Sequence, residues 1–312
     1  MPSSQALRLC PDLQFISPNF AHYREVSGQM REIFARYTDL IEPLSLDEAY
    51  LDVSDSEHHQ GSATLIARAI KQSVRQEVGI TVSAGVAPNK FLAKVASDWE
   101  KPDGLFVIEP AQVLSFVEKL PVNKINGVGK VTYKKLQDLG IETCGDIAES
   151  KPELILSKFG KHGARLIQLA QGIDDRRVTT DRIRKSISVE HTYDIDLPNP
   201  KTINEKLPKI YGELKERLEK YEARVPGASK RIHKYFVKLK FNDFTQTTLE
   251  HTLQMQETWD NIPAIIQMLE EAWDRQAKPV RLIGLGLRFK TPEFSGGGLQ
   301  LDLFEDREVR KI

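Results

Sequence analysis

The sequence predicts a protein of several domains that mixes α-helices with β-strands. Its 312 residues correspond to about two or three domains, and 40% apolar with 28% charged residues is typical of a folded globular chain. Apolar residues recur at three-to-four spacing over residues 64–78 and 88–99, which predicts helices. Strand-like runs lie beside them at residues 51–53 and 81–86, so the N-terminal third is expected to be mixed α/β.

Two adjacent carboxylates, Asp47 and Glu48, lie in the otherwise apolar segment from Ser45 to Asp52. Neighbouring side chains on a strand point to opposite faces, so the two acids can converge on one ion only where the chain bends, as at a hairpin tip. Magnesium prefers oxygen ligands, and two carboxylates with substrate phosphates can hold it for phosphoryl transfer. The pattern therefore predicts a bend with a candidate metal site, and the alternative is a surface turn with two solvated acids.

The helix predicted over residues 88–99 begins at Pro88, a residue type favoured in the first helical turn. Lys90 and Lys94 lie one turn apart on the same face, and we expect both to be solvated. The buried stripe is expected to comprise Phe91, Leu92, Val95 and Ala96.

The next four residues, Lys101-Pro102-Asp103-Gly104, have the chemistry of a reverse turn. Pro102 fixes its own φ, and Gly104 is expected to take a positive φ. From the residues alone, Lys101 is a solvated lysine.

Residues 119–150 predict two helices joined by the glycine turn Gly127-Val128-Gly129. Gly127 and Gly129 let the backbone approach a phosphate, and the free amides of the following helix point toward it. The lysines that follow add positive charge, so the unit is expected to position DNA without reading its sequence. The alternative is a helical hairpin that uses glycine only to turn. The lysines are Lys130, Lys134 and Lys135.

Arginines at residues 176–177 and in the segment 182–185 mark a stretch of weak periodicity, which predicts a linker. Beyond it, residues 223–242 hold six Lys or Arg and no acid, and apolar and basic side chains alternate near Lys238 and Lys240. One face of this strand is expected to enter the core and the other to meet phosphates. Strands are predicted at 188–193, 236–241, 245–249 and 281–289, and helices at 204–221 and 262–275.

After Phe294 the chain continues through Ser295-Gly296-Gly297-Gly298 to a short amphipathic peptide. A flexible spacer with such a peptide predicts a docking tail, and the alternative is a tail that packs on its own domain. The peptide comprises Gln300, Leu301, Asp302, Leu303 and Phe304.

The charge is uneven although the formal net charge is zero. Residues 1–100 carry 9 basic against 13 acidic residues, whereas residues 119–190 carry 14 against 9 and residues 201–250 carry 12 against 7. An acidic N-terminal part suits metal ions, and a basic C-terminal part suits a polyanion. The alternative is a local fluctuation of charge on solvated faces.

Composition also excludes several classes of protein. No apolar run approaches the roughly 18 residues of a membrane helix, and the start of the chain lacks a signal-peptide pattern, so we expect a cytoplasmic protein with no membrane partner. Cys10 and Cys144 stand alone, which predicts neither a zinc site nor a disulfide framework.

The segment from Ile41 to Val53 resembles the catalytic palm hairpin of the Y-family DNA polymerases, most of all those of the DinB type. The resemblance continues through Ser83 to Lys94, Lys101 to Gly104 and the linker tripeptide Arg184-Lys185-Ser186, and it covers nearly the whole chain. It implies an α+β, multidomain, partial right-hand polymerase. The implied parts are a remnant of the fingers (1–17), a palm without its first strand (18–109), a thumb with a helix-hairpin-helix (110–175), a linker (176–186), a little finger (187–291) and a flexible tail with a clamp-binding motif (292–312).

The resemblance also implies roles. Asp47 and Glu48 would be catalytic metal ligands for Mg²⁺, with two ions in the complete enzyme, and Lys101 would contact the triphosphate of the incoming nucleotide. DNA would be bound by Gly127, Gly129, Lys130, Lys134, Arg184, Lys185, Lys238 and Lys240, and a sliding clamp by Gln300, Leu301, Leu303 and Phe304. The partners would be primer–template DNA, deoxynucleoside triphosphates and the clamp, and the protein would act as a monomer.

Family members begin with a strand that carries a further metal-binding aspartate, which has no counterpart in this sequence. We therefore expect an N-terminally truncated polymerase whose catalysis collapses even if DNA binding survives. The complete form would be an error-prone translesion DNA polymerase. Two alternatives remain: a non-catalytic module that binds DNA and the clamp, and a nuclease that uses the same acids.

Overall fold

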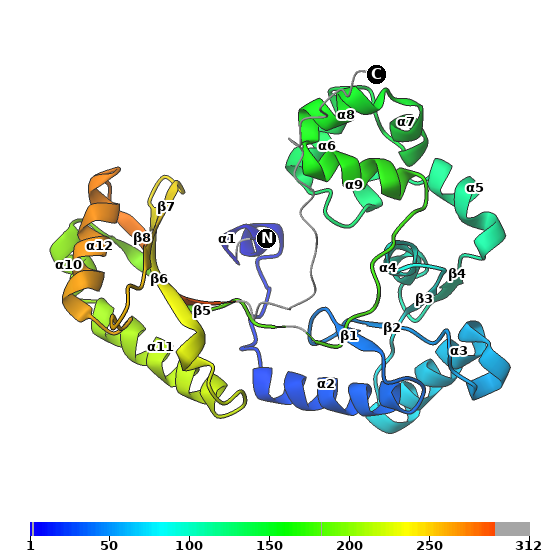
Figure 1. The fold of residues 1–312 in the computed structure, drawn as a ribbon, viewed down its shortest axis with the longest axis horizontal. Helices are drawn as coiled ribbons and strands as arrows, with labels where there is room; N and C mark the ends of the chain where they lie inside the picture. The colour runs from blue at the N-terminus through cyan, green and yellow to red at the C-terminus, as the bar shows by residue number, and fades with distance from the viewer. Residues whose placement is uncertain (2, 182, 291–312) are drawn as a thin grey trace, which may run out of the picture. The chain divides into compact units, whose positions relative to one another are not determined.

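The structure is a computed structural model that describes residue 1, residues 3–181 and residues 183–290. The chain divides into two compact units, Met1–Asp181 and Arg182–Ile312 (Figure 1). In the part of the chain that the structure describes, no helix has the length and apolarity to cross a membrane.

The first core of the N-terminal unit lies between two amphipathic helices, α2 (Phe20–Ala35) and α3 (Ala63–Ser73). Each begins at a polar residue whose side chain accepts a hydrogen bond from the first turn, Asn19 for α2 and Ser62 for α3. After α3, a π-helical turn (Val74–Val78) completes the helical stretch predicted for 64–78. The short helix α1 (Ser3–Leu9) has no buried residue. The core comprises Met30, Ile33, Ile66, Ile70 and Val74.

Two small sheets follow. Strands β1 (Ile41–Pro43) and β2 (Ala49–Leu51) form an antiparallel hairpin, whereas β3 (Ala84–Val86) and β4 (Leu105–Val107) pair in parallel. The run predicted at 51–53 was placed two residues too late, and the run predicted at 81–86 began three residues too early. In both places side chains form hydrogen bonds with backbone groups next to the strand. The Asp52 carboxylate accepts from the Ser54 N–H at 3.0 Å, and Lys71 Nζ donates to the Val82 carbonyl at 2.7 Å.

Helix α4 (Lys90–Trp99) packs closely on β3. A Cβ on Gly85 would lie 2.2 Å from the carbonyl oxygen of Ala93, so only glycine permits this approach. The helix begins after Asn89, whose side chain accepts a hydrogen bond from the Leu92 N–H at 3.0 Å. The predicted start at Pro88 was therefore wrong by two residues, because Asn89 supplies the cap.

A helical region continues the N-terminal unit. Its core includes the predicted stripe of α4, Phe91, Leu92, Val95 and Ala96, together with the buried Cys144. Burial raises the pKa of the Cys144 thiol to about 12, which makes it an inert core residue, whereas Cys10 is exposed. The helices are α5 (Val113–Glu118), α6 (Lys130–Gln137), α7 (Cys144–Glu149), α8 (Pro152–Phe159) and α9 (Lys161–Ala170).

The helix expected before the glycine turn is only a 3₁₀ turn (Val122–Lys124). Tertiary pairing competes with helix formation there, because the Val122 N–H donates to the Glu142 carbonyl at 2.9 Å and Pro121 bridges to Thr143.

The C-terminal unit is one antiparallel sheet with helices on its inner face. The strands are β5 (Ser186–Leu197), β6 (Ile232–Phe241), β7 (Gln246–Thr252) and β8 (Val280–Phe289), in the order β5-β8-β6-β7. Helix α11 (Leu207–Glu222) packs on β5 and β8, and α12 (Ile262–Asp274) packs on β6 and β7. The short α10 (Pro200–Asn204) contacts both helices. Each strand and helix predicted for this half has a counterpart here.

Candidate functional site

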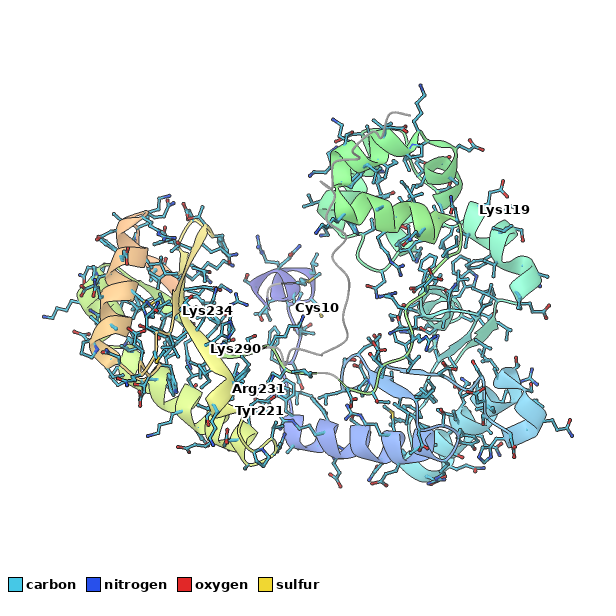
Figure 2. The ribbon with its side chains drawn as sticks, viewed as in Figure 1. Cys10, Lys119, Tyr221, Arg231, Lys234 and Lys290 are labelled. Atoms are coloured by element: carbon cyan, nitrogen blue, oxygen red, sulfur yellow. The ribbon has the colours of Figure 1, made fainter. Side chains whose placement is uncertain are left out.

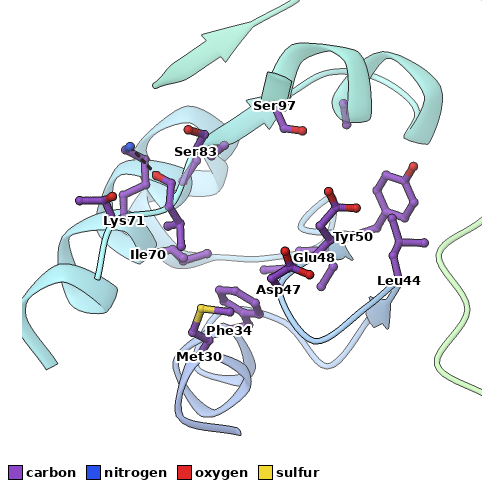
Figure 3. A pocket seen from close by; sticks show the side chains of 18 of the residues that line it. Met30, Phe34, Leu44, Asp47, Glu48, Tyr50, Ile70, Lys71, Ser83 and Ser97 are labelled. Atoms are coloured by element: carbon purple, nitrogen blue, oxygen red, sulfur yellow. Dashed lines mark hydrogen bonds between the residues drawn. The ribbon is translucent and has the colours of Figure 1, made fainter. Parts of the chain in front are cut away.

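The turn between β1 and β2 brings the two acids to the tip of a hairpin (Figure 3). The backbone N–H groups of Leu44 and Ser45 both donate to the carbonyl of Glu48, at 2.9 and 3.3 Å. These bonds close the turn over residues 44–48. The bend that Asp47 and Glu48 require in order to act together is therefore present.

Asp47 is exposed and held by its neighbour Ser45, whose hydroxyl donates to Oδ1 at 2.6 Å. This hydrogen bond lowers the pKa of Asp47 below its ordinary value, and the charges of Lys101 and Lys94 act in the same direction. Asp47 is thus an ionised oxygen donor at neutral pH.

Glu48 pairs with Lys94 of α4, whose Nζ lies 2.8 Å from Oε1 and 3.1 Å from the carboxylate of Asp98. Burial acts to lower the pKa of Lys94, but the hydrogen bonds to the two acids outweigh it and raise the pKa. The Lys94 side chain is only 17% exposed. The expectation of a solvated Lys94 was wrong, because α4 directs this face toward the acidic hairpin.

Lys90 was also expected in solvent, and its side chain is 8% exposed. It pairs with Glu42 of β1 and donates to the carbonyl of Arg177 at 3.2 Å. The same Glu42 oxygen accepts from the Thr179 N–H at 2.8 Å. A signal for this was present in the sequence: Lys90 and Lys94 are four residues apart on one helix, and Glu42 and Glu48 flank one turn.

Lys101 lies about half exposed beside Asp98, with 2.5 Å between its Nζ and Oδ1. The turn that it begins differs from the prediction. Asp103 takes the positive φ, at 51°, and its carboxylate pairs with Lys71 at 2.6 Å. Gly104 is required for a different reason, since a Cβ there would lie 2.1 Å from the carbonyl oxygen of Glu100.

Asp47, Glu48, Lys94 and Lys101 line one cavity of about 1010 Å³. Its other walls are largely apolar and come from α2, α3 and β3, including Met30, Phe34 and Ile70 (Figure 3). Charged groups among largely apolar walls suit a ligand that carries both anionic and apolar parts.

The acidic tip partly fits a divalent metal. Asp47 and Glu48 offer hard oxygen ligands on one turn, as Mg²⁺ and Mn²⁺ prefer. Among the described residues, no group of three or more His, Cys, Asp or Glu side chains could hold an ion. Two protein ligands therefore leave the remaining positions to water and substrate oxygens, and Lys94 must release Glu48.

The glycine turn leads directly into α6. Gly127 has a φ of 101°, which favours glycine, whereas Gly129 is extended and has open space around it. The first turn of α6 has no side-chain cap, so its backbone N–H groups are available to a phosphate. Lys130 and Lys134 are exposed one turn apart, and Lys134 lies 3.2 Å from Asp138.

The remaining predicted DNA-binding residues lie in the C-terminal unit. Arg184 and Lys185 are exposed before β5, with the Arg184 guanidinium 5.2 Å from the centre of the Tyr221 ring. Lys238 and Lys240 lie on the outer face of β6, opposite the buried side chains of that strand. Lys238 pairs with Glu190, and Lys240 lies over the Phe244 ring. Gln300, Leu301, Leu303 and Phe304 lie outside the described residues.

The residue that sequence reasoning missed most clearly is Asp174, whose side chain is fully buried. It accepts from Arg165, from Arg176 and from the Phe91 N–H. Burial acts to raise the pKa of Asp174, but the hydrogen bonds from the two arginines outweigh it and hold the pKa well below its usual range.

Comparison with known proteins agrees with this geometry. The impB/mucB/samB family model matches residues 1–98, and the model of its C-terminal domain matches residues 184–303. A third model, the thumb domain of DNA polymerase iota, matches residues 123–174. These models define a class, the Y-family DNA polymerases.

The particular branch follows from the relatives. DNA polymerase IV of Ectopseudomonas mendocina is 53% identical over 304 residues, which cover 97% of this chain and 83% of that protein. DNA polymerase IV of Pseudomonas fluorescens is 52% identical over 305 residues, with 98% and 83% covered. A solved chimera of the Y-family polymerases Dbh and Dpo4 superposes with a TM-score of 0.81 at 29% identity, over 92% of this chain and 82% of the chimera. The chain belongs to the Y family of DNA polymerases, in its DNA polymerase IV (DinB-type) branch. Members are DNA-directed DNA polymerases, which are metal-dependent nucleotidyltransferases.

Proposed function

We propose that this chain binds primer–template DNA and supports template-directed, error-prone nucleotide addition with Asp47 and Glu48 as the metal ligands. The observation that carries the proposal is the hairpin turn, which places both carboxylates on one cavity with Lys94 and Lys101. We assign Mg²⁺ as the metal, because both ligands are hard carboxylate oxygens.

We assign a separate role in nucleotide addition to each part of the cavity. The Asp47 and Glu48 carboxylates would hold Mg²⁺, which polarises phosphate oxygens and stabilises the charge that develops in phosphoryl transfer when it is bound. Lys101 would hold the triphosphate of the incoming nucleotide from the rim of the same cavity. The apolar walls of the cavity would exclude water from the reacting phosphates.

DNA would be held outside this cavity by two surfaces. We assign Gly127, Gly129, Lys130 and Lys134 to one, because an uncapped helix start and exposed lysines suit a phosphate. We assign Arg184, Lys185, Lys238 and Lys240 to the other. Solved Dbh complexes described as ternary, at 27–28% identity, give precedent for binding of DNA and nucleotide in this fold.

The proposal keeps the other sequence predictions. They are the domain limits, the monomeric state, the cytoplasmic location and a clamp-binding tail. Replacement of Leu303 and Phe304 by alanine should abolish binding to the sliding clamp and leave binding to bare DNA intact. Loss of both would mean that the tail belongs to the fold.

Single-nucleotide primer extension with Mg²⁺ tests the proposal. We expect only trace extension, because the described residues contribute only two carboxylates, and we expect Asp47→Ala to remove it. Extension by Asp47→Ala at an unchanged rate would overturn the metal assignment. Release of short DNA products would favour a nuclease, and DNA binding without any extension would favour the non-catalytic module.

A further inference from the structure

The outer face of the C-terminal sheet carries carboxylates among its cations. We use "outer sheet face" for the outward residues of the four strands, which include the charged residues Glu190, Lys234, Lys238, Lys240, Glu250 and Arg288. Figure 2 labels Lys234 on this sheet. The basic run of residues 223–242, which holds no acid in sequence, therefore meets acids from neighbouring strands.

Glu190 and Lys238 form the first pair. Both lie opposite Gly284 of β8 in the register, one from each side. Lys238 Nζ is 3.1 Å from both carboxylate oxygens of Glu190. A Cβ on Gly284 would lie 3.0 Å from Cγ of Glu190 and 3.3 Å from Cβ of Lys238, so the glycine leaves room for the pair to close across β8.

Glu250 of β7 holds two more cations. Arg288 Nε donates to its Oε1 at 2.6 Å, and Lys234 Nζ lies 3.7 Å from its Oε2. The Arg288 guanidinium also lies 5.3 Å from the centre of the Phe236 ring. Phe236 is directly opposite Gly286, so this glycine leaves the ring space on the face.

Lys234, Lys238 and Arg288 are therefore engaged by carboxylates within the described sheet. Lys240 has no carboxylate partner in the described residues, and it lies 4.7 Å from the centre of the Phe244 ring, which the Arg281 guanidinium also approaches at 5.3 Å. All three pairs remain partly exposed, with side-chain exposures between 26% and 45%, so a phosphate can reach the cations.

We propose that Glu190 and Glu250 limit the affinity of this face for DNA by competing with phosphates for Lys238, Lys234 and Arg288. The proposal rests on the proposed DNA-binding function of the face. Each phosphate contact then replaces an ion pair within the protein, and this exchange reduces the net gain from binding. The acids make binding weaker and less dependent on salt than the same lysines and arginine would give alone.

The test is the affinity of the full chain for fluorescent primer–template DNA, measured by anisotropy over a salt series. Glu190→Gln keeps the size of the side chain and frees Lys238. We expect binding several-fold tighter at low salt, with a log Kd against log salt slope steeper by up to about 0.9. Glu250→Gln should act similarly through Lys234 and Arg288, which provides an independent second variant.

The matched control is Glu216→Gln. Glu216 pairs with Lys220 on α11 at 2.5 Å, so its replacement changes the net charge equally but frees no cation on the outer sheet face. The double variant Glu190→Gln with Lys238→Gln should bind like Lys238→Gln alone, because the gain requires the freed lysine.

The outcomes distinguish failure of the competition from failure of the DNA contact. A gain from Glu190→Gln no larger than that from Glu216→Gln, weaker binding, or a gain that persists without Lys238 would each overturn the competition. If Lys238→Gln leaves DNA binding unchanged, the proposed DNA contact of this face is itself wrong.

Discussion

The buried carboxylate of Asp174 accepts a hydrogen bond from the backbone N–H of Phe91 at 2.9 Å. It thereby joins the chain after α9 to the first turn of α4, the helix whose lysines hold the acidic hairpin. Nearby, the Asn89 side chain donates to the Gly172 carbonyl at 2.8 Å. The acidic hairpin of β1 and β2 and the helical region are thus fixed to each other through α4.

Asp174→Asn should destabilise the protein by about 1–3 kcal/mol, because it removes the charge that Arg165 and Arg176 face and leaves their hydrogen bonds weakened. Urea unfolding measures the change. The neighbouring Asp175 is exposed, so Asp175→Asn is the matched control and should leave stability within about 0.5 kcal/mol. Equal changes in stability for both variants would show that the buried charge of Asp174 does not stabilise the fold.

The pH dependence of stability should also report Asp174. Its pKa is lower in the folded protein than the unfolded value of about 3.9, so the unfolded state binds the proton more readily. Its contribution is fully present above about pH 4 and is lost as the pH falls toward the folded pKa. The stability difference between the unchanged chain and Asp174→Asn should therefore narrow below about pH 4. A difference that is constant from pH 7 to pH 3 contradicts this.

Lys90→Ala should destabilise the protein by about 3 kcal/mol, because Glu42 would remain largely buried without its cation. Lys135→Ala on α6 removes an exposed lysine and should change stability by less than about 0.5 kcal/mol. Thermal or urea unfolding distinguishes the two. If Lys90→Ala is as stable as Lys135→Ala, the pairing with Glu42 does not support the hairpin.

Lys130→Gln with Lys134→Gln should weaken DNA binding without changing sequence preference, because phosphate contacts carry no sequence information. Each lost contact should reduce the salt slope by about one. Lys158→Gln, at an exposed position of α8 that the proposal does not assign to the DNA interface, is the control. An unchanged slope in the double variant would exclude the glycine turn and α6 from the DNA interface.

Much of this molecule was predictable because local pattern and tertiary structure agree. The alternation around Lys238 predicted a strand with one core face, and Tyr235, Val237, Leu239 and Phe241 are buried there. The adjacency of Asp47 and Glu48 required a bend, and the hairpin supplies one.

What could not be predicted depends on contacts between residues far apart in the sequence. Lys90 and Lys94 look solvated until β1 and β2 lie beside α4, and Glu190 is 48 residues from the lysine that it holds. Asp174 shows no periodicity, and only its tertiary partners mark it. The metal and DNA assignments stay predictions for a different reason, because they concern ligands of the chain rather than contacts within it.

The most direct test of the metal role proposed for Asp47 and Glu48 is Mn²⁺ binding, measured by electron paramagnetic resonance with primer–template DNA and a non-hydrolysable nucleotide present. We expect Asp47→Ala and Glu48→Ala each to weaken Mn²⁺ binding at least about tenfold, because each removes a charged ligand. Asp55→Ala, at an exposed acid outside the cavity, should leave Mn²⁺ binding unchanged. Equal Mn²⁺ affinity in the unchanged chain and both hairpin variants would contradict the metal role.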